Sequence, residues 1–276
     1  MPPRPGGRGT GTLAAVEATE RFAQLMAGPE AAAHPDVAGL LIAAHARPDL
    51  DLPTEEARLD ALAAGCPEPT LDGLRAHLFD DLGFRGNDRD YHDPRNSYLD
   101  QVVERRLGIP ISLSVLTIGV GRRLGVPLVG VGMPGHFLVG DRVDRDVFLD
   151  PFHGGRVLDA RGCERIFQGL QGPGAAFHPS FLQPTGNHAV VARMLANLKQ
   201  IFTSRGDARA LAWVLRLRVL VPGVPVEEHA ELASALAAVG SFGAAAEAMG
   251  SLAGHTSGAD AERYSATAER LRARLN

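Results

Sequence analysis

The sequence contains few residues of the types that build disulfide frameworks, zinc centres or membrane spans. Its 276 residues include two cysteines, Cys66 and Cys163, which lie far apart and without a CxxC partner. Neither a disulfide framework nor a structural zinc site is therefore indicated. Arg122 and Arg123 interrupt the longest apolar stretch, so no run approaches the roughly 20 residues that cross a bilayer.

Lysine is almost absent, and the charge balance is slightly acidic. Lys199 is the sole lysine, and the formal net charge is −4 at pH 7. This balance gives no electrostatic reason to expect nucleic acid or an anionic membrane as a partner. Residues 1–12 are rich in Pro, Gly and Arg and lack a hydrophobic stretch before a cleavage site. They predict a disordered tail rather than a signal peptide, and thus a cytoplasmic protein.

The region from residue 13 to residue 82 has a helical pattern. Apolar residues recur at three- and four-residue spacing within 13–26, 37–46, 54–64 and 71–79, which predicts four helices. Prolines lie between these segments and separate them. Thr54, followed by Glu55 and Glu56, is the expected N-cap of the third helix.

Residues 83–184 show a different pattern, which predicts a core of mixed structure. A long connection of aromatic, acidic and turn-forming residues covers 83–97, and a helix is expected over 98–107. Gly108-Ile109-Pro110 then opens a segment, 111–124, that is apolar on nearly every side. Such a helix is buried, and proline is favourable at its first position. Short strand-like runs follow at 128–133, 136–139 and 147–150.

His136 and Asp150 lie in two of these runs, on either side of a turn-like stretch at 141–145. If the runs form a hairpin, the simplest register places His136 opposite Asp150, Leu138 opposite Phe148 and Gly140 opposite Asp146. Directly opposed Cβ atoms lie about 5 Å apart, so the imidazole and the carboxylate can hydrogen-bond. Such an Asp fixes the tautomer of the His and leaves its other nitrogen free as a base. A nucleophile would complete a catalytic triad.

Residues 185–276 predict further helices with an internal repeat. Gly206-Asp207 and Gly240-Ser241 lie 34 residues apart, and Ala210 and Ala212 recur as Ala244 and Ala246. Thirty-four residues is the tetratricopeptide period. Helix pairs of this kind stack into a concave surface that commonly holds a peptide, although two units can equally cap a neighbouring domain.

Several motifs together resemble the SirB/YchA-type transglutaminase-like family. The matching segments are residues 82–87, 93–99, 106–114, 134–139 and 149–155. The resemblance covers roughly residues 37–248, including the helical N-terminal region and the tetratricopeptide-like end. It implies an α+β fold in which a central buried helix packs against an antiparallel sheet, as in papain-type proteases.

In the wider superfamily, a Gly-x-Cys sequence opens the central helix and supplies the nucleophile, while the sheet carries His and Asp. Here Gly108-Ile109-Pro110 lies where Gly-x-Cys would fall. The resemblance therefore implies that Pro110 occupies the position of the nucleophile. Proline has no side-chain heteroatom to activate, whereas a cysteine at a helix N-terminus has a lowered pKa.

Two serines and one cysteine are alternative nucleophiles. Ser114 lies one turn after Pro110 on about the same helix face, whereas Ser112 points about 200° away. Each of these residues also has a structural interpretation. Helical serines bond to preceding backbone carbonyls, and Cys163 can be an ordinary half-buried thiol. His153, taken with His136 and His92, shows no metal-ligand spacing. No metal or cofactor is expected.

Three hypotheses remain open at this stage. The first is a non-catalytic or regulatory module, a pseudoenzyme whose degenerate protease-like groove and helical repeats bind a protein or peptide. We expect this groove to be lined by Asn96, Tyr98, Pro110 and His153. The second is a hydrolase or acyltransferase of amide or ester bonds, in which Ser114 attacks, His136 is the general base and Asp150 orients it. The third is a structural scaffold in a larger assembly, with the groove empty.

Overall fold

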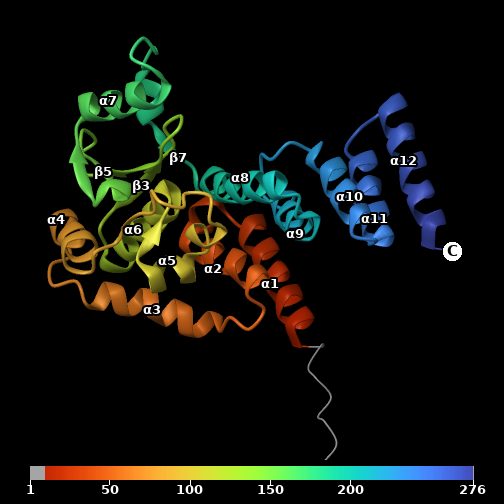
Figure 1. The fold of residues 1–276 in the computed structure, drawn as a ribbon, viewed down its shortest axis with the longest axis horizontal. Coiled ribbons are helices and arrows are strands. Elements are labelled where there is room, and N and C mark those ends of the chain that lie inside the picture. Colours follow the sequence, from red (N-terminus) through yellow and green to blue (C-terminus); the bar gives the residue numbers. More distant parts are fainter. Residues whose placement is uncertain (1–9, 276) are drawn as a thin grey trace, which may run out of the picture. The chain divides into compact units, whose positions relative to one another are not determined.

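The computed structural model describes residues 10–275, with side chains described from residue 15. The chain divides into two compact units, residues 1–194 and residues 195–276. The first unit combines helices with a five-stranded sheet in which all neighbouring strands are antiparallel (Figure 1). This mixture is the α+β architecture that the sequence predicts.

The N-terminal helices of the first unit are confirmed close to their predicted positions. They are α1 (Thr10–Ala27), α2 (Pro35–Ala46), α3 (Leu52–Ala64) and α4 (Leu71–Arg75), and a π-helical turn, η2 (Ala76–Asp81), continues α4. Residues 1–9 of the predicted tail lie outside the described residues, whereas residues 10–12 are helical. Thr54 is not the N-cap of α3. Asp51 takes that position, and the Thr54 hydroxyl donates to its carboxylate over 2.6 Å.

A pair of very short parallel strands leads into the central helix. Strand β1 (Arg85–Gly86) pairs with β2 (Leu107–Gly108), so that Gly86 lies beside Gly108. Between the two strands lie the 3₁₀ turn η3 (Pro94–Asn96) and helix α5 (Leu99–Arg105). This pairing holds the start of the long 87–98 connection beside Gly108, which lies just before the central helix.

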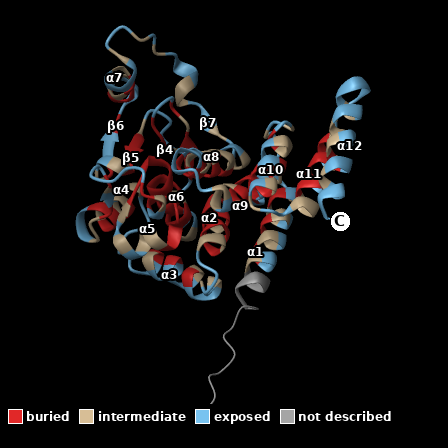
Figure 2. Cartoon of the chain, turned by 45° about the vertical axis from the view of Figure 1, so that its right-hand side comes forward, coloured by how far each residue is buried: buried red, intermediate tan, exposed pale blue. Residues whose placement is uncertain are grey.

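Helix α6 (Pro110–Leu124) is the centre of the first unit, and most of its residues are buried (Figure 2). It contacts α2, α3, α4 and α5 as well as strands β3 and β4. Near its C-terminal end, the buried Asp36 carboxylate of α2 accepts hydrogen bonds from Arg122 over 2.9 Å and from Arg123 over 2.6 Å. The predicted helix that is apolar all round is thus confirmed as the core helix.

The sheet has the strand order β6-β5-β4-β3-β7. Its strands are β3 (Leu128–Val131), β4 (Leu138–Asp141), β5 (Phe148–Asp150), β6 (Arg156–Leu158) and β7 (Pro184–Thr185). The predicted hairpin of β4 and β5 is present, but the predicted register is wrong by two residues, since Gly140 pairs with Phe148. A slip of two leaves every side chain on the same face, so the hydrophobic pattern cannot detect it. The turn decides the register, because Val147 N–H donates to the Asp144 carbonyl over 3.1 Å.

Helix α7 (Ala160–Gln171) has no counterpart among the predicted elements. Cys163 and Phe167 of α7 pack in one cluster with sheet residues Val131, Leu138 and Phe148. Strands β6 and β7, which also escaped prediction, contain three and two residues. Strands this short carry too little alternation to be read from sequence.

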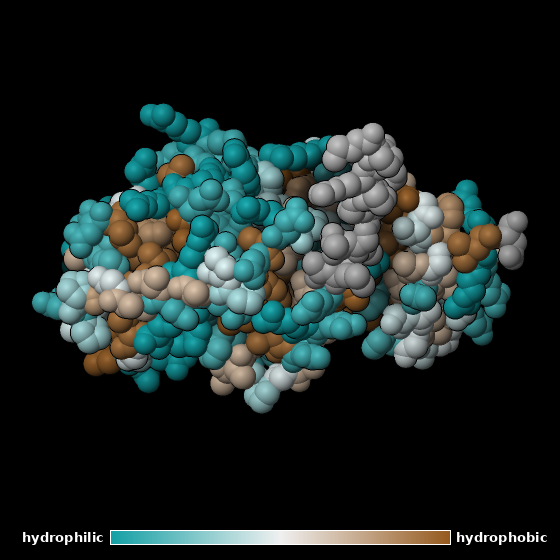
Figure 3. All heavy atoms as spheres, turned by 90° about the horizontal axis from the view of Figure 1, so that it is seen from below, coloured by the Kyte–Doolittle hydropathy of each residue, from teal (hydrophilic) through white to brown (hydrophobic). Residues whose placement is uncertain are grey.

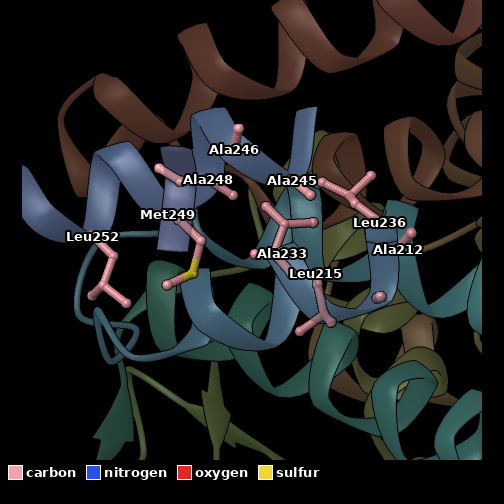
Figure 4. Packing of buried hydrophobic residues seen from close by; sticks show 12 residues of the cluster. Ala212, Leu215, Ala233, Leu236, Ala245, Ala246, Ala248, Met249 and Leu252 are labelled. Carbon is pink, nitrogen blue, oxygen red and sulfur yellow. The ribbon is translucent and has the colours of Figure 1, made fainter. Parts of the chain in front are cut away.

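Helix α8 (Asn187–Arg205) runs from the first unit into the second. The second unit continues with α9 (Ala208–Arg218), α10 (Glu228–Ala238), α11 (Phe242–Gly254) and α12 (Gly258–Arg272). Alanine and leucine side chains of these helices form its core (Figure 4). The remaining 3₁₀ turns of the chain are η1 (Glu30–Ala32), η4 (Pro151–His153), η5 (Pro179–Leu182) and η6 (Ala273–Leu275).

The 34-residue spacing corresponds to the starts of α9 and α11. Gly206 and Gly240 precede these helices with φ values of 65° and 79°, a left-handed conformation that favours glycine. Asp207 caps α9 by accepting from the Ala210 N–H over 2.9 Å. Ser241 is the N-cap of α11 but makes no such side-chain bond. The repeated Gly-polar pair therefore marks two helix starts, of which α9 has the side-chain cap.

No helix within residues 10–275 is long and apolar enough to span a membrane. On the face drawn in Figure 3, hydrophobic residues lie in separate patches between hydrophilic ones.

The Asp36 ion pairs predict an acid-sensitive contribution to stability. Burial alone raises the pKa of Asp36, but the hydrogen bonds and charges of Arg123 and Arg122 outweigh burial, and the pKa lies below the ordinary 3.8. The stabilisation by these ion pairs is therefore complete above the ordinary pKa of 3.8. It is lost as the pH falls through the lower pKa of Asp36 in the folded protein. We expect Asp36→Asn to lower the free energy of unfolding by about 2 kcal/mol at pH 7, and by progressively less below about pH 4.

Urea denaturation at pH 7 and at pH 3 measures this difference. Asp88→Asn, at an exposed position, is the control and should change stability little at either pH. An Asp36→Asn effect of the same size at both pH values would contradict the assigned role of the carboxylate.

The turn after Asp150 offers a matched pair of glycine substitutions. Gly154 and Gly155 both have positive φ, 69° and 68°. A Cβ atom on Gly155 would lie 2.1 Å from the Phe79 ring, whereas one on Gly154 would meet nothing within 4 Å. Gly154→Ala should therefore cost only the conformational penalty, about 1–2 kcal/mol. Gly155→Ala should cost about 2–5 kcal/mol, since overpacking adds to it. Chemical denaturation of the two variants tests this, and equal losses would show that Phe79 moves aside freely.

Candidate functional site

Asp150, the last residue of β5, is a fully buried carboxylate shared by two histidines. Its Oδ1 atom lies 2.9 Å from His136 Nε2, and its Oδ2 atom lies 2.6 Å from His153 Nδ1. Oδ1 also accepts from the backbone N–H of His153 over 3.3 Å, which caps the η4 turn. The predicted proximity of His136 and Asp150 is thus present, although they are not directly paired in the ladder.

The surroundings of Asp150 keep its carboxyl group ionised. Burial raises the pKa of Asp150, but the hydrogen bonds and charges of His136 and His153 outweigh burial. The net pKa lies below the ordinary value of 3.8. A carboxylate at neutral pH accepts hydrogen bonds only, so each contacting ring nitrogen carries the proton.

His136 is positioned by the turn before β4 and by a distant arginine. Gly135 precedes it with φ 79°, a conformation that favours glycine. Arg193 of α8 donates to the His136 carbonyl over 2.7 Å and to the Met133 carbonyl over 3.1 Å. Its guanidinium also lies over the Phe137 ring, 5.2 Å from the centroid. The His136 ring, 5 % exposed, is therefore fixed through its backbone.

The η4 turn places this group beside the start of α6. A Cβ atom on Gly86 would lie 2.5 Å from the Phe152 ring, so Phe152 packs directly on β1. Gly86 in turn pairs with Gly108, two residues before Pro110. The absence of a side chain at Gly86 thus brings η4 next to the loop that opens the central helix.

A group of rings surrounds the two histidines near the surface. The centroid of Phe152 lies 5.2 Å from His153, 6.2 Å from His136 and 6.0 Å from Tyr91. Tyr91 in turn contacts His92 edge to face at 5.4 Å. Tyr91 is 42 % exposed and the His153 side chain 54 %. We call Tyr91, His92, Phe152 and His153 the ring surface.

Within the described residues, none of the candidate nucleophiles is hydrogen-bonded to the His136 ring. The fully buried Ser114 hydroxyl donates to the Phe137 carbonyl over 3.4 Å. The sequence analysis predicted a bond to a preceding carbonyl of its own helix instead. Ser112 donates to the Asn96 carbonyl over 2.6 Å and accepts from the Ile109 N–H over 3.1 Å. Within the described residues, no hydroxyl or thiol is hydrogen-bonded to the His136 ring.

Cys163 is chemically unsuited to attack. Burial and the nearby Asp159 and Asp150 carboxylates raise the pKa of its thiol to about 12. The thiolate is the reactive form, and it is negligibly populated at neutral pH. The ordinary role of a buried thiol in the core therefore describes this residue.

Three of the four residues expected to line a groove are buried. Asn96, Tyr98 and Pro110 lie inside the fold, and only His153 reaches the surface. Pro110 is the first residue of α6, after an Ile109 in extended conformation. Asn96 organises the connection before α5, because its amide donates to the Asp90 and Tyr91 carbonyls and accepts from Asn87. Only His153 of the expected groove residues is therefore accessible at the surface.

The structure also contains a hollow of about 840 Å³ elsewhere in the first unit. Strand residues Val129, Val131 and Phe148 line it together with Leu182 and Arg142. Its lining includes none of the residues that the sequence analysis assigned to a site.

Sequence reasoning missed His153 as a partner of Asp150, and it missed Tyr91, Phe152 and Arg193. Phe152 and His153 lie in the Asp-Pro-Phe-His motif that carried the resemblance, so their nearness to Asp150 was open to inference. Arg193 is more than 50 residues from the carbonyl groups that it binds, and no local pattern marks it. His136, Asp150 and His153 offer three ligand atoms that lie within 4.8 Å of one another, and His92 is not part of that group.

Comparison with known proteins identifies a family that this chain matches. The family model of the Transglutaminase-like superfamily matches residues 42–196. A UPF0162 protein of Xylella fastidiosa (strain Temecula1) is 42 % identical over 201 residues, which cover 67 % of this chain and 71 % of that protein. A UPF0162 protein of Vibrio cholerae is 37 % identical over 124 residues, 44 % of this chain and 46 % of the relative.

A relative with a different name shares a shorter segment. F-box only protein 21 of Mus musculus is 42 % identical over 105 residues, which cover 35 % of this chain and 17 % of that protein. No solved structure matches the chain. The match over more than half of the chain, together with the buried helix, the antiparallel sheet and the His136–Asp150 pair, shows that this chain belongs to the transglutaminase-like superfamily.

Proposed function

We propose that this protein is a non-catalytic transglutaminase-like module of the SirB/YchA type that binds a protein or peptide partner. The observation that carries the proposal is that α6 begins with Pro110, the residue that the resemblance assigns to the position of the nucleophile. Proline cannot supply a thiolate or an alkoxide. A His–Asp pair without a nucleophile orients groups but forms no acyl intermediate.

The hydrogen bonds of the two serines support this proposal. Ser112 is engaged by Asn96 and Ile109 and so closes the first turn of the helix. Ser114 is fully buried, and its oxygen lies out of reach of a substrate carbonyl. An attacking oxygen must instead be exposed to substrate and within hydrogen-bond reach of the base.

The ring surface supports a role in binding. Aromatic side chains are enriched where proteins contact one another, because they bury a large area with few rotatable bonds. Tyr91 and His153 are exposed, while Phe152 is anchored on Gly86. The segment shared with F-box only protein 21 makes up 17 % of that protein, which fits a module that is joined to other parts in larger chains.

The helices of the second unit support a second contact area of tetratricopeptide type. The starts of α9 and α11 are 34 residues apart, and the helices share a core of alanine, leucine and methionine side chains. Stacked helix pairs of this length commonly present a surface to a peptide.

An activity-based probe tests the non-catalytic role. We expect a fluorophosphonate, which labels activated serines, to label the wild-type protein no more than heat-denatured protein, because neither serine is activated. A serine hydrolase treated in parallel is the positive control. Labelling of the wild type that disappears in Ser114→Ala would overturn the proposal and establish the hydrolase alternative.

The ring surface is tested through recovery of a crosslinked partner from cells. Tyr91→Ala should lower recovery about tenfold, because interface tyrosines often contribute more than 1 kcal/mol to binding. Val143→Ala is the matched control, since Val143 is 79 % exposed and lies on the β4–β5 loop. Equal recovery with Tyr91→Ala and with Val143→Ala would place the partner elsewhere.

A further inference from the structure

We propose that His136, Asp150 and His153 together bind a divalent transition-metal ion of the zinc type. The proposal needs only these three side chains and does not rest on the proposed function. Among the residues that the structure describes, these are the three whose potential ligand atoms gather within 4.8 Å of one another.

The kinds of donor atom favour zinc and its first-row neighbours. Two imidazole nitrogens and one carboxylate oxygen suit Zn²⁺, Fe²⁺ or Co²⁺, whereas Mg²⁺ and Ca²⁺ prefer oxygen ligands only. Zinc sites with three protein ligands commonly combine histidine with a carboxylate and leave a fourth position for water. The side chains present here form such a set.

The spacing of the donor atoms is close to that of a metal site. Zinc binds nitrogen and oxygen at about 2.1 Å, so tetrahedral ligand atoms lie about 3.4 Å apart. His136 Nε2 and His153 Nδ1 now lie 2.9 Å and 2.6 Å from the two Asp150 oxygens. These contacts are about 0.5 Å and 0.8 Å shorter than the spacing around zinc, so both rings must rotate away from Asp150 to admit an ion.

Metal binding requires a change of tautomer at both histidines, because the ring nitrogens that now donate to Asp150 must first lose their protons. The Asp150 carboxylate, which both histidine rings already contact, provides the oxygen ligand. Each neutral imidazole binds metal once its proton resides on the nitrogen that faces away from Asp150. The metal then replaces the two N–H···O hydrogen bonds that hold the triad together.

Burial gives the cluster a closed side and an open side. Asp150 and His136 are 0 % and 5 % exposed. They form the inner side of the cluster, where little water competes with the ion for these two ligands. The His153 side chain is 54 % exposed and provides the entry path. A His–Asp pair that served only as base and orienter would not require this second histidine on the other carboxylate oxygen.

The test is zinc binding to the whole chain, measured by titration calorimetry with ZnCl₂ on metal-free protein. CoCl₂ is titrated in parallel because its visible absorption reports the coordination geometry. We expect one ion per chain for the wild type. His153→Ala should bind zinc at least about 100-fold more weakly, since even loss of an outer-shell partner costs 10- to 100-fold.

Two control variants test whether zinc binds at this cluster rather than at other histidines. His92→Ala removes the exposed neighbour that lies outside the cluster. His255→Ala removes one of a pair in the second unit, His229 and His255, whose rings lie 5.9 Å apart. Both should retain the affinity of the wild type.

A thermal-shift measurement gives an independent readout. Saturating zinc should raise the melting temperature of the wild type and of Tyr91→Ala, but not that of His153→Ala. Zinc affinity that is equal in the wild type and in His153→Ala would overturn the proposal, as would an affinity lost in His255→Ala. Because Tyr91→Ala keeps the cluster, failure of partner binding and failure of metal binding are distinguishable.

Discussion

A buried negative charge at Asp150 organises the whole neighbourhood of the site. An ionised carboxylate taken out of water loses several kcal/mol of hydration unless donors replace it. His136, His153 and the His153 backbone N–H supply those donors from two segments. The requirement to satisfy this one group thus fixes the approach to β4, the end of β5 and the η4 turn in a single arrangement.

The start of the central helix meets a related requirement, because its backbone N–H groups also need partners. A helix N-terminus presents N–H groups that lack partners, and enzymes with this architecture use them to stabilise a thiolate or an oxyanion. Here proline removes one donor, and Ser112 bonds across to the preceding connection. The polar groups at the start of α6 are therefore used to hold the fold together.

The sequence permitted prediction of the long helices between residues 13 and 124 and of one half of the site. Helices with a clear three- and four-residue period, such as α2 and α6, were predicted within a few residues of their observed ends. The pairing of His136 with Asp150 was predicted although the register was wrong, because a slip of two keeps both side chains on the same face. Strands β6 and β7, with two or three residues, carry no readable period.

The remainder of the site depends on contacts that the linear sequence does not display. Asn96, Tyr98 and Pro110 lie in the motifs that carried the resemblance, and yet they are buried. The role of Arg193 follows only from the folded path of α8. The contact of His153 with Asp150 depends on the η4 turn. The spacing of three residues between an Asp and a His does not by itself predict such a contact.

The connection from Asn87 to Asn96 is held internally. Asn96 binds two carbonyls of this segment, its carbonyl accepts from Ser112, and Asp93 caps the following turn. A loop that is already ordered loses little conformational entropy when something docks on it. Tyr91 is thus presented in advance of any encounter, so a partner's association rate should reflect diffusion and shape rather than slow loop rearrangement.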